Sequence, residues 1–218
     1  IQDTIKKNYC DIYLNENLFN AKVSVKCEKK KCVKLIGQKY CLIKNTGIIK
    51  KEKKIFIKKP VFFIFFGGSD KLNLTIKILN LLKNLNNIKV NVAIGKSNKS
   101  IKDIKKYKSK NINIFVQYNK IHNLIKKCNI AVVAGGCILW DLLYVGISTV
   151  AFCTSSNQYF NLVNLHNKKF ILLYDMKKKI NNNFLVFLKK NLLNKILLNK
   201  KKIVDGNGVA RLIKHIKK

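Results

Sequence analysis

Two pairs of adjacent glycines, each between an apolar run and a helical pattern, are the features of this sequence best suited to chemistry. Gly67 and Gly68 end the apolar run 61–66 and are followed by Ser69 and Asp70. Paired glycines at a strand end let the backbone approach a ligand closely, and the next helix start offers free N–H groups to an anion. A simple strand-terminating turn also uses two glycines, so this loop alone supports both interpretations.

The second pair, Gly135 and Gly136, leads through Cys137 into another helical pattern. Asp141 lies one turn into that helix, where a carboxylate can accept hydrogen bonds from the vicinal hydroxyls of a ribose. The alternative is an ordinary acidic residue in a first helical turn, where the helix dipole favours it. Two glycine-pair helix starts at the same end of one sheet favour a diphosphate site over two unrelated turns.

Two further polar stretches follow apolar runs. Asn157 and Gln158 carry amides that can bind sugar hydroxyls or N-acetyl groups, although Ser155 or Ser156 beside them could simply cap a helix. The stretch 205–211, Asp-Gly-Asn-Gly-Val-Ala-Arg, is also typical of a polar turn before a helix.

Apolar periodicity places these loops between alternating strands and helices. The predicted strands are 11–15, 61–66, 90–94, 112–116, 130–133, 149–152 and 170–173, and the predicted helices are 72–85, 101–107, 121–127, 138–144, 157–167, 183–198 and 209–217. This alternation predicts an α/β fold with a doubly wound parallel sheet, whose ligands bind beyond the carboxyl ends of the strands. Residues 20–59 are irregular and Lys-rich. We therefore expect 1–59 to be the end of a preceding domain with a linker, and 60–218 to be the ligand-binding domain.

The formal charge of +35 admits a nucleic-acid or anionic-surface binder. However, the lysines lie in every segment, and Arg211 is the only arginine, although arginine is the residue that reads phosphate and guanine best. Composition drift in an AT-rich genome is the interpretation that we favour, so no specific nucleic-acid partner is expected.

Other features point to a cytoplasmic protein. The seven cysteines are odd in number and scattered, which predicts free, mostly buried thiols rather than a disulfide framework. Cys27 and Cys32 lack the companions of a zinc site, so no metal is expected. The apolar region 129–153 is interrupted by glycines and reads as strand, loop, helix and strand rather than as a transmembrane segment. No signal peptide is visible, and the first residue, Ile1, suggests a fragment or a trimmed chain.

Taken together, the loops resemble the UDP-2,4-diacetamido-2,4,6-trideoxy-β-L-altropyranose hydrolases of pseudaminic acid biosynthesis. These are GT-B proteins related to the MurG glycosyltransferases. The motifs that carry the resemblance are Phe-Gly-Gly-Ser-Asp-x-x-Asn-x-Thr (66–75), Gly-Gly-x-x-x-Trp-Asp (135–141), Gly-Ile-Ser-Thr (146–149), Asn-Gln (157–158) and Asp-Gly-x-Gly-x-x-Arg (205–211). Upstream, 10–15 is similar to a late strand of the family's N-terminal domain, and 37–44 to its Gly-Pro-x-Tyr segment.

The resemblance implies the Rossmann-like C-terminal half of a GT-B fold, preceded by a remnant of the N-terminal domain. It implies attack of water on a UDP-linked sugar, without a cofactor, to release UDP and the free sugar. Phosphate contacts would come from the glycine loops, the ribose contact from Asp141, the sugar contacts from the amide pair and the uracil contact from the strand end near Val116. The implied UDP-binding residues are Gly67, Gly68, Ser69, Asp70, Val116, Gly135, Gly136, Cys137, Asp141, Asn157 and Gln158.

The chain departs from the family at several positions. The family usually has Glu at Asp141, Pro at Lys71, and Ser or Thr at Cys137. The glycine-rich start and catalytic histidine of the family's N-terminal domain have no match in this sequence, so no catalytic residue is assigned here. The three histidines present are interpreted as surface or helix-packing residues: His122, His166 and His215.

Four hypotheses follow. The first is a UDP-sugar hydrolase that becomes active when a separate N-terminal domain chain completes it. The second is the donor-binding subunit of a split MurG-like glycosyltransferase. The third is a basic nucleic-acid-binding protein, and the fourth is a decayed remnant that keeps the fold without activity.

Overall fold

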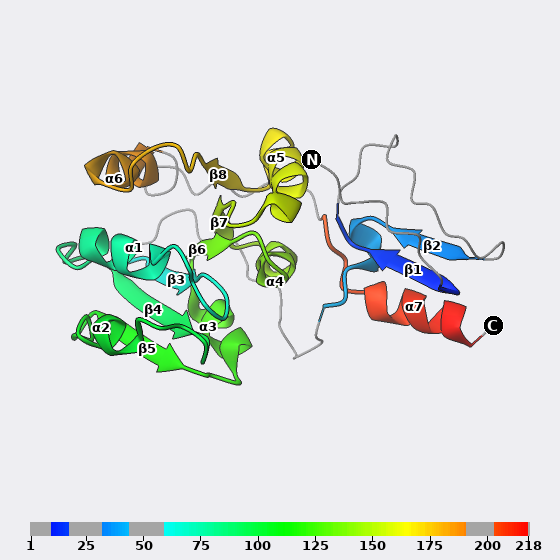
Figure 1. The fold of residues 1–218 in the computed structure, drawn as a ribbon, viewed down its shortest axis with the longest axis horizontal. Helices are drawn as coiled ribbons and strands as arrows, with labels where there is room; N and C mark the ends of the chain where they lie inside the picture. The colour runs from blue at the N-terminus through cyan, green and yellow to red at the C-terminus, as the bar shows by residue number, and fades with distance from the viewer. Residues whose placement is uncertain (1–9, 18–31, 44–58, 191–202, 218) are drawn as a thin grey trace.

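In the computed structural model, residues 10–17, 32–43, 59–190 and 203–217 are described, and most of them form a parallel sheet covered by helices (Figure 1). The six strands of this sheet are β3 (Val61–Phe65), β4 (Lys89–Ile94), β5 (Ile112–Val116), β6 (Ile130–Ala134), β7 (Ser148–Phe152) and β8 (Leu172–Tyr174). The helices between them are α1 (Leu74–Leu82), α2 (Ile101–Lys105), α3 (Ile121–Lys127), α4 (Ile138–Val145), α5 (Tyr159–Asn167), which follows the 3₁₀ turn η2 (Ser156–Gln158), and α6 (Asn182–Leu188).

The strand order is β5-β4-β3-β6-β7-β8, and every pairing is parallel. The first strand of the sheet, β3, therefore has the next strand, β4, on one side and β6 on the other. Strands are added outward in one direction up to β5, and in the other direction from β6 onward. This confirms the predicted doubly wound α/β fold.

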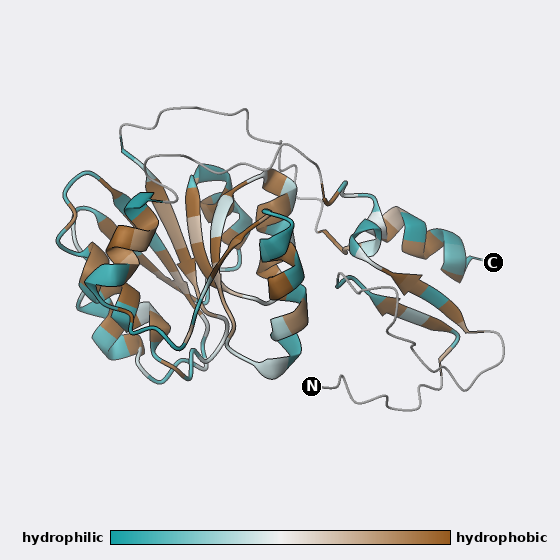
Figure 2. Ribbon diagram, turned by 90° about the horizontal axis from the view of Figure 1, so that it is seen from above, coloured by the Kyte–Doolittle hydropathy of each residue, from teal (hydrophilic) through white to brown (hydrophobic). Residues whose placement is uncertain are grey.

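The sheet is apolar on both faces because helices cover both faces, as expected for parallel strands (Figure 2). On β3, Phe62 and Ile64 pack into one layer with α1, α2 and α6, while Phe63 packs into the other with α3, α4 and α5. All three side chains are fully buried. The uninterrupted apolar run of β3 is thus the sequence signature of a central strand.

A second, smaller unit lies beside the sheet (Figures 1 and 2). Strands β1 (Ile12–Asn15) and β2 (Val33–Ile36) pair in parallel, and the 3₁₀ turn η1 (Gln38–Tyr40) follows β2. Helix α7 (Gly208–Ile216) comes from the far end of the chain and contacts η1. The small unit is therefore built from both ends of the sequence.

Two of the predicted elements need correction. The stretch 20–59 was expected to be irregular, but it contains β2 and η1. Strand β2 is short, and Val33 and Lys34 are exposed, so its apolar pattern is weak. The helix predicted at 183–198 is α-helical as α6 only to Leu188, and residues 191–198 lie outside the described part, as do Cys27 and residue 44.

The six described cysteines are free thiols, as predicted, but only Cys41 and Cys128 are buried. The Sγ atoms of Cys10 and Cys32 lie 3.8 Å apart beside the β1–β2 pair. Within the described residues, no helix combines the length and apolar character needed to cross a membrane.

The Asp-Gly-x-Gly-x-x-Arg motif forms the contact between α7 and η1. Arg211 donates from both terminal nitrogens to the Asp205 carboxylate, at 2.9 and 2.6 Å, and from Nη1 to the Lys39 carbonyl at 2.7 Å. Gly208 lies against the backbone of Cys41. The only arginine of the chain therefore serves this structural contact.

Acid should weaken this contact. The hydrogen bonds from Arg211 hold the pKa of Asp205 below its ordinary value, so its contribution to stability is present above the unfolded pKa of about 3.9 and is lost as the pH falls through the folded pKa. We expect Asp205→Asn to lower the melting temperature at neutral pH and to differ little from the unsubstituted chain in strong acid. Thermal unfolding followed by circular dichroism across this pH range measures the effect. Asp175→Asn, at an exposed position, is the control; an Asp205→Asn deficit that persists unchanged in acid would contradict the assignment.

Candidate functional site

The two glycine pairs lie side by side at the carboxyl edge of the sheet. Residue Phe65 of β3 pairs with Val133 of β6, so the loops that leave these two strands are neighbours. This is the point where the strand order reverses, the position at which open α/β sheets leave a crevice for ligands. The topology thus places both loops next to each other at this edge of the sheet.

The loop after β3 is held close to the loop after β4. A Cβ atom on Gly95 would lie 2.4 Å from Gly68 Cα and 2.7 Å from its carbonyl oxygen. Gly67 has a left-handed φ of +82°, which turns the chain as the strand ends. Gly68 and Ser69 are exposed on the rim. Gly95 is therefore a supporting residue of this loop, and its position directly after a predicted strand is the sequence signal for it.

Asp70 has a different task from the predicted contact with UDP. Its side chain is buried, and its two oxygens accept hydrogen bonds from the backbone N–H groups of Leu74 and Thr75, both at 2.9 Å. N–H groups in the first turn of a helix have no hydrogen-bond partner within the helix, and the Asp70 carboxylate supplies one for these two. Its negative charge also interacts favourably with the positive end of the α1 dipole. Asp70 therefore positions the loop against α1, and its contact with UDP stays a prediction.

The two glycines before α4 differ in their surroundings. Gly135 packs against α5, since a Cβ atom there would lie 2.6 Å from Leu162 Cδ1, and its N–H donates to the Phe152 carbonyl at 3.1 Å. Gly136 is exposed and has open space around it, as does the start of the helix at Cys137. The first helical hydrogen bonds begin at Leu139, so the N–H groups of residues 136–138 precede them and point out of the helix.

The residue predicted to contact uracil ends a flanking strand, and those predicted to contact the sugar lie in the turn η2 after β7. Val116 ends β5, is half-buried and pairs with Ile94, two strands from β3. On the other side, Gln158 Oε1 accepts hydrogen bonds from the N–H and hydroxyl of Thr154, at 3.0 and 3.2 Å. Asn157 Oδ1 accepts from the Ser155 hydroxyl, which therefore does not cap the following turn. Both amide oxygens thus order the loop itself.

Asp141 lies in a half-buried polar cluster that the sequence did not predict. His122 Nε2, from α3, lies 3.4 Å from Asp141 Oδ2. The Trp140 indole N–H donates to the carboxylate of Glu16, which follows β1 in the small unit. Burial raises the pKa of Glu16, and the nearby Asp141 charge raises it further.

Negatively charged side chains gather near this cluster, although the chain as a whole carries a formal charge of +35. Three of its ten carboxylates, those of Glu16, Asp141 and Asp205, lie close enough to raise the pKa of the Cys41 thiol, although burial is the larger cause. The cluster is where the small unit meets α4. Random drift toward lysine does not account for acidic groups gathered at one place.

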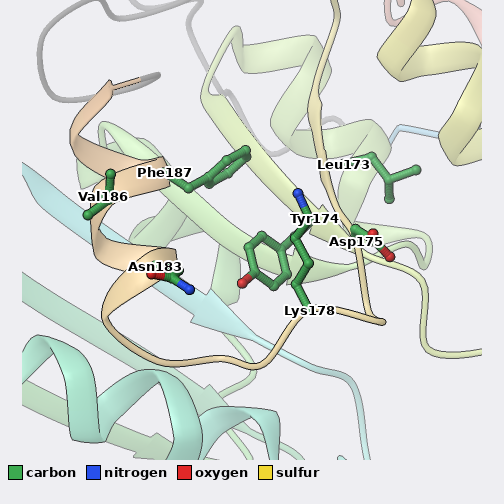
Figure 3. Close-up of a pocket in the computed structure, with 7 residues that line it drawn as sticks. All are labelled: Leu173, Tyr174, Asp175, Lys178, Asn183, Val186 and Phe187. Carbon is green, nitrogen blue, oxygen red and sulfur yellow. The ribbon is translucent and has the colours of Figure 1, made fainter.

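One pocket of the described residues lies away from the glycine loops. A cavity of about 620 Å³ lies between β8 and α6 (Figure 3) and is lined by Leu173, Tyr174, Asp175, Lys178, Asn183, Val186 and Phe187. It lies at the edge strand, two strands beyond β6, and none of the predicted UDP-binding residues lines it. Among the described residues, no hydrogen bond is found for the backbone N–H groups of Gly68, Ser69, Gly136 and Cys137, and an anion needs such donors, so the glycine loops remain the candidate site.

Comparison with known proteins gives a sequence relative and several structural neighbours. No protein-family model matches the chain. The UDP-2,4-diacetamido-2,4,6-trideoxy-beta-L-altropyranose hydrolase of Campylobacter jejuni is 29% identical over 164 residues, which are 72% of this chain and 57% of that protein. An uncharacterized protein of Methanocaldococcus jannaschii, MJ1062, is 29% identical over 133 residues, 56% of this chain and 28% of that one. The chain thus spans little more than half of the first relative.

The structural neighbours show the fold. MurG of Acinetobacter baumannii superposes with a TM-score of 0.57 at 12% identity, covering 84% of this chain and 56% of that one. A UDP-GlcNAc 2-epimerase from Neisseria meningitidis, solved with UDP-GlcNAc bound, gives 0.54 at 14% identity, covering 73% and 45%. The resemblance drawn from the loop motifs is confirmed: the chain is similar in sequence to the UDP-diacetamido-trideoxy-altropyranose hydrolases and has the Rossmann-like α/β fold of MurG-like GT-B glycosyltransferases and epimerases.

Proposed function

We propose that this chain binds the UDP part of a UDP-linked diacetamido-trideoxy sugar and is the nucleotide-binding half of a hydrolase of nonulosonic acid biosynthesis. The observation that carries the proposal is the meeting of the two glycine loops at the reversal point of the sheet, with Asp141 one turn behind one of them. The sequence similarity to the Campylobacter jejuni hydrolase supports the choice of substrate class.

Each part of UDP has a proposed partner. The diphosphate accepts hydrogen bonds from backbone N–H groups around Gly68 and Ser69 and from those at the start of α4, Gly136 and Cys137, where the helix dipole also favours an anion. The Asp141 carboxylate accepts from the ribose hydroxyls. The uracil lies against the end of β5 near Val116.

The reaction needs a second half. Water attacks the UDP-sugar, the linkage between the sugar and the diphosphate breaks, and UDP and the free sugar leave. We assign no catalytic residue to these 218 residues and place the catalytic histidine in the N-terminal domain of the hydrolase. In this scheme residues 1–59 end that domain and form the linker, and 60–218 bind UDP, with α7 lying back against η1.

Calorimetric titration of UDP into the purified chain at moderate salt tests the proposal, with UMP and ADP as competitor nucleotides. We expect selective UDP binding that Asp141→Ala weakens by about tenfold or more, the cost of a lost charge-assisted hydrogen bond. Asp175→Ala, an exposed acid on another loop, is the matched control and should bind normally. Equal binding of every phosphate compound would show that the lysines act non-specifically and would overturn the proposal.

A donor-binding subunit of a split MurG-like glycosyltransferase is the second candidate, because the fold superposes on MurG. The same UDP site would serve both functions. With an N-terminal half added, release of free sugar favours the hydrolase, and transfer to an acceptor favours the transferase. Tight binding to random DNA that weakens steeply as the salt concentration rises, without selectivity for UDP, would instead favour a nucleic-acid binder.

A further inference from the structure

His122 lies where the sequence predicted an incidental histidine, yet it meets the residue proposed to hold the ribose. It is the second residue of α3, the helix that follows β5, and α3 packs beside α4. The side chains of His122 and Asp141 are 15% and 16% exposed. Two polar groups are thus buried against each other at the edge of the proposed site.

The contact is incomplete as it stands. His122 Nε2 is buried and makes no hydrogen bond of normal geometry within the described residues, and its 3.4 Å approach to Asp141 Oδ2 is long. A buried polar atom without a hydrogen bond costs free energy and calls for an explanation. Functional hydrogen bonds are often long in the free protein and shorten when the ligand is bound.

Several titratable groups lie near Asp141. Burial raises the pKa of Asp141, while the nearby His122 lowers it. The Glu16 carboxylate, from the end of β1, and the Cys41 thiol, after η1, lie on the side of the small unit and both interact with Asp141. His122 is therefore the neighbour that favours the ionised carboxylate, the form that only accepts hydrogen bonds.

We propose that His122 is a positioning residue for the nucleotide: its Nε2–H holds Oδ2 of Asp141 so that Oδ1 is directed at the ribose hydroxyls. This inference rests on the proposed function. It also accounts for a departure from the resembled family, which usually has Glu at this position. The Asp side chain has one methylene fewer than Glu and reaches less far. Holding its carboxylate in one direction compensates for the shorter reach.

The test is UDP affinity measured by calorimetry between neutral pH and the acid limit of folding, on the whole chain. His122→Leu removes both the donor and the charge, and we expect it to weaken UDP binding by about tenfold. The pH below which UDP binding is lost should also rise, because His122 then no longer offsets the effect of burial on the pKa of Asp141. His122→Gln keeps a neutral donor and should recover part of the affinity without restoring the pH profile. His215→Gln on α7 is the matched control and should leave both unchanged.

The outcomes separate this inference from the proposed function. If the unsubstituted chain binds UDP and His122→Leu binds equally well with the same pH profile, His122 has no positioning role while the proposed function stands. If both His122 variants lose UDP affinity equally and the pH dependence of binding does not shift, the residue only supports folding, which would also overturn the inference. If the unsubstituted chain does not bind UDP selectively, the proposed function falls and this inference falls with it.

Discussion

Gly208→Ala is expected to lower the stability of the chain by about 3 kcal/mol, the upper end of the usual cost of overpacking. A Cβ atom at this position would lie 2.1 Å from the Cys41 carbonyl oxygen and 2.7 Å from its carbonyl carbon. These are backbone atoms, which cannot rotate away as a side chain can. Alanine would otherwise favour the helix by about 1 kcal/mol, so the steric cost exceeds the gain in helix propensity.

Chemical denaturation measures the change, and hydrogen exchange of the α7 amides shows where it acts. We expect the amides of α7 to lose protection first, because the clash separates this helix from η1. Val209→Ala, at the next and exposed position, should change stability by no more than about 0.5 kcal/mol. A Gly208→Ala chain as stable as the original would show that α7 does not pack against Cys41 as described.

Gly95→Ala is expected to damage the candidate site and the fold together. The added methyl group would lie 2.4 Å from Gly68 Cα, so the loop after β3 must move. We expect a stability loss of about 1–3 kcal/mol. The displaced loop should also lose at least one backbone hydrogen bond to the diphosphate, which weakens UDP binding by about tenfold.

The matched control is Gly68→Ala, on the other side of the same contact. A Cβ atom on Gly68 meets no atom within 4 Å, so this chain should fold with nearly unchanged stability. Thermal unfolding of the two variants therefore compares the same chemical change with and without a clash. UDP titration of Gly95→Ala is compared with that of the unsubstituted chain, because Gly68 is itself proposed to contact the diphosphate. Gly95→Ala that binds UDP normally would show that the position of the loop is unimportant to the site.

Most secondary structure of the sheet follows from local sequence. Strand β5 and helix α3 have the predicted bounds, and the other strands and helices of the sheet up to β8 differ by a few residues. Continuous apolar runs such as that of β3, bounded by glycines, have few conformations other than a buried parallel strand. Strand β2 was missed because two of its four residues are exposed and its flanks are rich in lysine, so little periodicity remains.

Several roles depended on partners far away in the chain. The sequence did not indicate that Asp70 accepts hydrogen bonds at the start of α1 or that Gly135 makes room for Leu162, and the predicted ligand contacts of both residues stay predictions. Nothing near Arg211 in the sequence indicates that it donates to the Lys39 carbonyl, 172 residues away. His122 and Asp141 read as unrelated residues until α3 and α4 bring them together.

The sequence by itself therefore determined the alternation of strands and helices, the glycine loops at the strand ends and, through their motifs, the class of protein that the chain resembles. These depend on local periodicity and backbone freedom, which neighbouring residues set. Only the tertiary structure decided that β3 lies between β4 and β6, because strand order depends on packing between distant segments. That order places the two glycine loops next to each other, and tertiary packing adds His122 of α3 and Glu16 after β1 to the surroundings of Asp141.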